Sequence, residues 1–263
     1  MKRRDFLFAC FVIIWLTGQV WGGGDMSKIL VLTDGLVSEY AWGPANERWL
    51  GPAHYPVEFY AKGLLHYNNR FQKYLQPYKD IQVEILDLER IDGEIPLKGI
   101  DLLILDDVRA VVLKEHLHQI IDFVKKGHSL IINAGFYGFG GKKPDPEASL
   151  LVKERLSYKD IGLDSFLPVK QTKSPDYVIA KNPIPRIDKN FHLFKGIPRD
   201  GWKVFGYHEV EGKRGSKVLA WIEKTPLLSY SKLGKGNVYV YTGSDLEWCH
   251  SKLDYSPWLF ENL

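Results

Sequence analysis

The sequence is poor in cysteine, since its 263 residues include only Cys10 and Cys249. Because Cys10 lies in the N-terminal segment, the rest of the chain contains a single thiol, and we expect no internal disulfide bond. One thiol also cannot supply the thiolates of a structural zinc site. The count thus excludes a zinc thiolate site, and we predict no metal site and no cofactor.

The chain also lacks an excess of charge of one sign. Its 35 Lys and Arg residues face 32 Asp and Glu residues, which gives a formal net charge of +3. Proteins that bind nucleic acids concentrate positive charge on one face, so we expect no nucleic-acid partner. The partner predicted instead is a small molecule.

The N-terminal segment has the composition of an export signal. Lys2, Arg3 and Arg4 precede an apolar run at 6–16 that is short for a membrane span. We expect residues 1–25 to be a signal peptide or a membrane anchor, with membrane contact only through residues 6–21. Residues 26–263 are then one domain of an exported or anchored protein. The alternative is a translation start at Met26, which would make the protein cytoplasmic.

A strand, a helix and a second strand are predicted between residues 100 and 141. The apolar run Leu102–Leu105 ends at Asp106 and Asp107, and the run Leu130–Ile132 ends at Asn133 and a glycine-rich loop. Between the two runs, apolar residues recur at spacings of three and four, as on one face of a helix: Leu113, Leu117, Ile120, Ile121 and Val124. Such a unit joins two parallel strands, and ligands bind beyond the carboxyl ends of those strands.

Shorter apolar segments predict the other elements. We expect strands at 28–33 and 81–86, the latter near the sheet edge, and antiparallel strands at 177–180, 204–210, 217–222, 227–230 and 237–241. A short helix is expected at 159–166, and His116 and His118 are expected on the surface. Together these elements predict an α/β fold with a mostly parallel central sheet and additional antiparallel strands in the C-terminal half.

Acidic and histidine side chains are the candidates for chemistry. Asp34, Asp107 and Asp245 each follow a predicted strand, where carboxylates can bind a cation, act as acid or base, or simply cap a loop. The candidate catalytic residues are Asp107, Asp245, His208 and His250. The candidate ligand-binding residues are Asp34, Asp107, Asn133, Gly135, Tyr137, Tyr207, Asp245 and Trp248.

The turn after Ile132 provides neither a phosphate-binding loop nor a nucleophile. A Walker A loop would need glycine at position 136 and Ser or Thr at position 143, but the chain has Phe136 and Lys143 there. Nucleophilic catalysis needs Ser or Cys on such a turn, and residues 133–137 contain neither.

Five segments in order resemble the class I glutamine amidotransferase-like proteins, near the ThuA-like group: KILVLTD at 28–34, DLLILDDV at 101–108, IIDFVKKGHSLIINAGFYGFGG at 120–141, VFGYHEV at 204–210 and GKGNVYVYTGSD at 234–245. The resemblance implies a flavodoxin-like three-layer sandwich. Active members of that superfamily carry a nucleophilic Cys in a Gly-x-Cys-x-Gly turn. The corresponding turn, Ala134–Gly138, has no Cys, so we expect no glutaminase activity.

Three functions follow as hypotheses. The first is a domain without a nucleophile that binds a small polar ligand, such as a sugar, at the carboxyl edge of the sheet. The second is a hydrolase or isomerase that uses strand-end Asp and His residues, with or without a divalent ion. The third is a structural or oligomerisation module, as such domains are in some glycosidases, which would make the protein a homo-oligomer.

Overall fold

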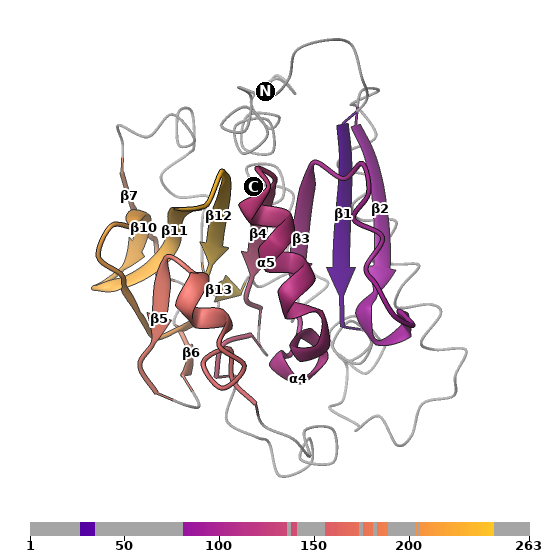
Figure 1. Cartoon of the computed structure of the whole chain (residues 1–263). Coiled ribbons are helices and arrows are strands. Elements are labelled where there is room, and N and C mark those ends of the chain that lie inside the picture. The colour runs from indigo at the N-terminus through magenta and orange to yellow at the C-terminus, as the bar shows by residue number, and fades with distance from the viewer. Residues whose placement is uncertain are drawn as a thin grey trace, which may run out of the picture.

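A mixed eight-stranded sheet forms the centre of the molecule, with strand order β2-β1-β3-β4-β12-β11-β10-β7 (Figure 1). The computed structural model describes residues 27–34, 81–135, 138–140, 156–173, 176–180, 183–188, 204 and 206–244. The strands of this sheet are β1 (Ser27–Thr33), β2 (Ile81–Asp87), β3 (Leu102–Asp106), β4 (Ser129–Asn133), β7 (Arg186–Ile187), β10 (Lys217–Ile222), β11 (Thr225–Leu233) and β12 (Gly236–Tyr241).

The first five strands in this order are parallel and the remainder are antiparallel. β1 pairs in parallel with β2 and β3, and β4 pairs in parallel with β3 and β12. β11 then pairs antiparallel with β12 and β10 through tight hairpins, and β7 closes the sheet. The predicted α/β fold is confirmed, including the position of β2 at the sheet edge and the antiparallel strands of the C-terminal half.

One face of the parallel strands packs on the helical segment between β3 and β4. Alternate residues of each strand enter this core, as the two-residue period of a pleated strand requires. The strand residues concerned are Leu30, Leu32, Leu103, Leu105, Leu130, Ile132, Val238 and Val240. On the helical side the same core contains Leu113, Ile120, Phe123 and Val124. Figure 1 shows α5 (Leu117–Lys125) lying across this face of the sheet.

The predicted single helix is instead broken in two. α4 (Ala110–Leu113) leads into a 3-10 turn, η4 (Lys114–His116), and then into α5. In a 3-10 turn residues three apart share a face, so His116 follows Leu113 toward the interior. The expectation that His116 lies on the surface is therefore wrong, whereas His118 is exposed as expected.

Two further predicted elements are shorter than expected. The segment 204–210 changes partners at Glu209, since β8 (Gly206–His208) pairs with β6 (Tyr177–Ile179) and β9 (Val210–Gly212) pairs with β5 (Val169–Gln171). The predicted helix at 159–166 is a series of turns that ends in a 3-10 helix, η6 (Leu163–Phe166), preceded by Gly162 in the left-handed region.

A small second sheet, β13-β8-β6, lies beyond the end of β12. β13 (Gly243–Ser244) follows β12 after a single residue, Thr242, and pairs with β8. The backbone N–H of His208 donates to the carbonyl of Thr242 at 2.9 Å. This connection brings β8 to the carboxyl edge of the parallel strands. Among the described residues, no helix combines the length and the apolar character that crossing a bilayer requires.

Candidate functional site

Polar side chains from β3 and β4 meet at the carboxyl edge of the sheet. The side-chain amide of Asn133 donates to Asp106 Oδ1 at 2.5 Å, and the backbone N–H of Asp107 donates to the Asn133 carbonyl at 2.8 Å. Both carboxylates are buried. The sequence analysis placed Asp107 and Asn133 in one site because parallel strands end together, and the register of Asp106 against Asn133 places them side by side.

A partly buried arginine joins the end of β1 to this edge. Arg109 lies two residues beyond Asp107 and binds Asp34 in a fork, with Nε–Oδ2 at 2.5 Å and Nη2–Oδ1 at 2.9 Å. Its backbone N–H also donates to Asp34 Oδ2 at 3.1 Å, and its guanidinium contacts Glu89. Burial lowers the pKa of Arg109, but the hydrogen bonds and charges of Asp34 and Glu89 outweigh burial and raise the pKa. Asp34 therefore holds the charged guanidinium of Arg109 in a fixed position.

Asp107 and Gly135 pack against each other at the turn after β4. Both have left-handed backbones, with φ of 52° at Asp107 and 56° at Gly135. A Cβ atom on Gly135 would lie 2.1 Å from Asp107 Cγ and 2.4 Å from Asp107 Oδ2. Since such distances are far below contact, only glycine fits at position 135 while Asp107 keeps its place. The left-handed conformation of Asp107 is costly for a residue with a side chain, and such positions cluster at functional sites.

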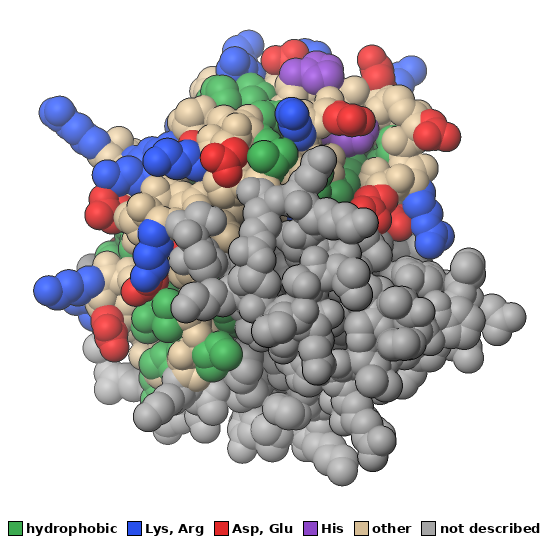
Figure 2. Space-filling view, turned by 90° about the horizontal axis from the view of Figure 1, so that it is seen from below, with side chains coloured by type: hydrophobic (Ala, Val, Ile, Leu, Met, Phe, Trp, Pro, Cys, Tyr) green, Lys and Arg blue, Asp and Glu red, His purple; other side chains and the backbone are tan. Residues whose placement is uncertain are grey.

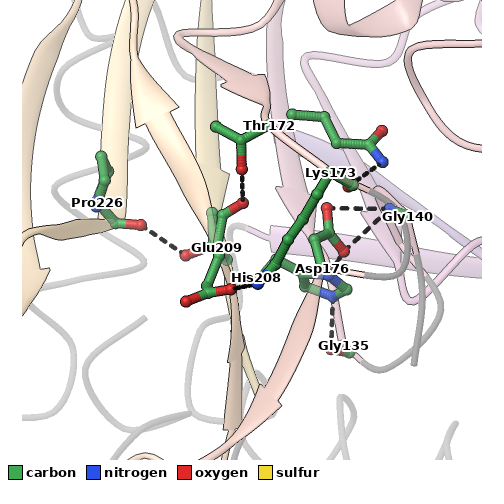
Figure 3. Close-up of polar contacts among 10 residues, drawn as sticks. Gly135, Gly140, Thr172, Lys173, Asp176, His208, Glu209 and Pro226 are labelled. Carbon is green, nitrogen blue, oxygen red and sulfur yellow. Dashed lines mark hydrogen bonds and ion pairs between the residues drawn. The ribbon is translucent and has the colours of Figure 1, made fainter. Parts of the chain in front are cut away.

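A buried histidine reaches the same turn from the second sheet. His208 Nδ1 lies 2.7 Å from Asp176 Oδ1, and Nε2 lies 3.2 Å from the carbonyl oxygen of Gly135 (Figure 3). Both side chains of the pair are 0% exposed. Asp176 also accepts from the backbone N–H of Gly140, at 3.1 and 3.2 Å. The pair therefore holds the glycine-rich turn at both of its ends.

Tyr158 lies on the interior side of these polar residues. Its hydroxyl donates to the carbonyl of Val108 at 2.8 Å, and its ring packs on Phe139 at 5.0 Å. Burial raises the pKa of Tyr158 well above its usual value, and the charges of nearby carboxylates raise it further. Those carboxylates belong to Asp107, Asp34, Asp106 and Asp176. The phenol thus stays neutral and acts as a hydrogen-bond donor.

The structure brings together five of the residues proposed from the sequence: Asp34, Asp107, Asn133, Gly135 and His208. Tyr207 instead points away from His208, as neighbouring residues of a strand do, and packs in a second core with Val204, Leu219 and Leu228. Four candidates lie outside the described residues: Tyr137, Asp245, Trp248 and His250.

Sequence reasoning missed Arg109, Glu89, Asp176 and Tyr158. Arg109 carried a usable signal, because it follows two strand-end carboxylates at the start of a helix. Asp176 carried none, since it precedes a short strand in a segment without hydrophobic periodicity. The structure shows its role only through contacts with His208 and Gly140.

Viewed onto the carboxyl edge, the described surface carries Lys and Arg side chains interspersed with Asp and Glu (Figure 2). Such mixed charge gives no field of one sign. Within the described ranges, no group of three or more His, Cys, Asp or Glu side chains is arranged to hold a metal ion.

Comparison with known families identifies the group to which this architecture belongs. The model of the family described as "Putative glutamine amidotransferase" matches residues 102–262, which is more than half of the chain. The chain belongs to this family. The matched range contains β3, the turn at Gly135 and the pair of Asp176 with His208. Among curated proteins, no sequence matches the chain.

Solved structures give this amidotransferase-like chain the same fold at low sequence identity. The cytoplasmic protein STM1381 from Salmonella typhimurium LT2 is 18% identical, with a TM-score of 0.58 over 89% of this chain and 93% of that one. The cytoplasmic protein STM3548 from Salmonella typhimurium is also 18% identical, with a TM-score of 0.56 over 66% and 74%. A cold-adapted β-galactosidase from Rahnella sp. R3 is 16% identical, with a TM-score of 0.50 over 95% of this chain and 32% of that one.

Proposed function

We propose that this amidotransferase-like domain binds a small polar ligand at the carboxyl edge of its sheet and does not hydrolyse glutamine. The observation that carries the proposal is the packing of Asp107 against the Cα atom of Gly135. The position that corresponds to the nucleophilic Cys is Phe136, which has neither a thiol nor a hydroxyl group, and the residue before it, Gly135, has no room for a side chain beside Asp107.

The histidine beside the turn supports the same conclusion. In thiol or serine enzymes a histidine nitrogen takes the proton of the nucleophile, while a carboxylate orients the ring. Asp176 orients His208 in this manner, but Nε2 contacts the backbone carbonyl of Gly135. A carbonyl oxygen has no proton to give. The pair therefore acts here as a clamp on the turn.

The ligand we propose is a neutral polyhydroxylated molecule, such as a sugar. Asp106 and Asp107 are acceptors when ionised, and the Asn133 amide provides both a donor and an acceptor, whereas both oxygens of Asp34 bind Arg109. Sugar hydroxyls donate as well as accept, so they match this acceptor-rich edge better than an anion does. The fold is also found within a chain named β-galactosidase, which is compatible with a carbohydrate ligand for this domain.

Thermal unfolding with a panel of monosaccharides, disaccharides and amino acids tests this proposal. A ligand present at a hundred times its Kd stabilises the folded state by about 2.7 kcal/mol. For a domain of this size we expect that to raise Tm by about 5–10 °C. The Asp107→Asn variant should reduce the shift, whereas the control His118→Gln, at an exposed position on α5, should keep it. A panel without any binder would refute the proposal.

A second candidate is a hydrolase or isomerase, which the orientation of His208 by Asp176 favours. In that case the Nε2 atom would exchange its contact with Gly135 for a substrate proton. Liquid chromatography with mass detection of the same panel after incubation separates the two candidates, because hydrolysis changes the mass and isomerisation changes the retention time. Product formation that is lost in His208→Gln supports the enzyme, and unchanged ligands support the binding domain.

A further inference from the structure

Exposed lysines gather at the amino edge of the sheet, opposite the edge that carries the site. This lysine edge consists of Lys28, Lys98, Lys125, Lys126, Lys232 and Lys235, all of them exposed. In Figure 1 the strand arrows of β1 and β2 point down, so this edge is at the top of the view. Asp101 and Asp122 are the exposed acidic residues described there. Six lysines and two aspartates give the edge a formal charge of +4.

Direct contacts place five of these lysines, all except Lys98, on one continuous surface. The backbone N–H of Lys235 donates to the carbonyl of Lys125 at 3.2 Å, so the hairpin between β11 and β12 lies against the end of α5. Lys232 pairs with Asn237, which in turn pairs with Ser129 at the start of β4. On the other side of β4, the Ser129 N–H donates to the carbonyl of Asp101 at 3.3 Å. Asp101 also bonds the backbone of Lys28, which completes the chain of contacts.

No acidic side chain in the described part of the chain forms an ion pair with the lysine edge. Within the described residues, ion pairs are formed by Lys170, Lys173 and Lys217, and none of the recorded pairs involves the lysine edge. Lys125 and Lys126 do lie at the end of α5, where the helix dipole favours cations. That effect falls off within one turn and does not account for Lys28, Lys98 or Lys232. Lys125 Nζ lies over the Phe166 ring at 5.8 Å, a contact that leaves its positive charge in place. A group of like charges with no ion pair among the described residues fits a polyanionic surface.

We propose that the lysine edge is a docking surface for an anionic phospholipid membrane. β1 begins at this edge with Ser27, so residues 1–26 join the described fold there. Those residues include Lys2, Arg3, Arg4 and the apolar run at 6–16. An apolar anchor and a basic surface reinforce each other, because stable membrane attachment generally needs two signals. Docking through this edge leaves the carboxyl edge, with its site, facing away from the membrane.

Flotation of the full chain with lipid vesicles tests this inference. Vesicles of phosphatidylcholine alone are compared with vesicles containing about 30% phosphatidylserine, which have a negative surface potential. We expect stronger binding to the anionic vesicles and loss of that preference at high salt. Substitution of Lys125, Lys126 and Lys235 by Gln should weaken anionic binding by roughly fivefold per lysine, or about a hundredfold in all.

The matched control carries the same substitution at Lys114, Lys159 and Lys224, which are exposed and lie outside the lysine edge. We expect this control to bind anionic vesicles as the wild type does. If both triple variants bind like the wild type, the N-terminal segment alone accounts for binding and the inference is wrong. It is also wrong if the lysine-edge variant loses retention on heparin but keeps its vesicle binding, since the partner is then a soluble polyanion.

Discussion

Gly135→Ala should destabilise the protein by about 3 kcal/mol, which is large for the addition of one methyl group. Two effects combine at this position. The left-handed backbone, with φ of 56°, costs an L-residue about 1–2 kcal/mol. The added Cβ would also lie 2.1 Å from Asp107 Cγ, and overpacking of a buried position costs about 1–3 kcal/mol more. Urea unfolding of the wild type and the variant measures the difference in the free energy of unfolding.

Gly99→Ala is the matched control for this experiment. Gly99 has a φ of 75°, but a Cβ at that position would meet no atom within 4 Å. The variant therefore carries only the backbone penalty, about 1 kcal/mol. Equal destabilisation by the two substitutions would contradict the close packing of Asp107 on Gly135, and with it the exclusion of a side chain at position 135.

Asp176→Ala should destabilise the protein by about 3–5 kcal/mol, since it removes one partner of a fully buried pair. His208 Nδ1 and the Gly140 N–H would both lose their acceptor in the interior. Asp176→Asn should recover part of this loss, because an amide oxygen still accepts one of the two hydrogen bonds. The free energy of unfolding of the three proteins, measured in urea at neutral pH, gives the comparison.

Glu211→Ala provides the control for Asp176. Glu211 pairs with Lys170 at 2.8 Å, but the two side chains are 60% and 53% exposed. Exposed pairs contribute little, so we expect a change below about 1 kcal/mol. A loss at Asp176 no greater than that at Glu211 would mean that the pair with His208 does not hold the turn.

The parallel half of the fold could be predicted from the sequence because a strand that is buried on both faces appears as a continuous run of apolar residues. The runs at 102–105 and 130–132 are continuous and end in polar residues, and both are central strands. The break in the helix could not be predicted, since Leu113, Ile120 and Val124 keep helical spacing across the 3-10 turn. The structure shows the turn as a 3-10 helix, and the buried position of His116 is its consequence.

The site residues at the ends of adjacent strands could be predicted from the sequence. Those that meet only through contacts between distant parts of the chain could not. Asp107 and Asn133 converge because β3 and β4 are parallel neighbours. The link between Asp34 and Arg109 spans 75 positions in the sequence, and the contact of His208 with Gly135 spans 73. Neither follows from local spacing, because each depends on where a separate strand is placed in the fold.

The most direct test of the central claim, that the turn at Gly135 has no nucleophile, is release of glutamate from L-glutamine. The purified full chain is assayed beside its Cys249→Ala variant, which lacks the one thiol outside the N-terminal segment. We predict no glutamate above the buffer background from either protein. Release by the wild type that disappears in the Cys249→Ala variant would contradict the claim, since it would show a working thiol in this domain.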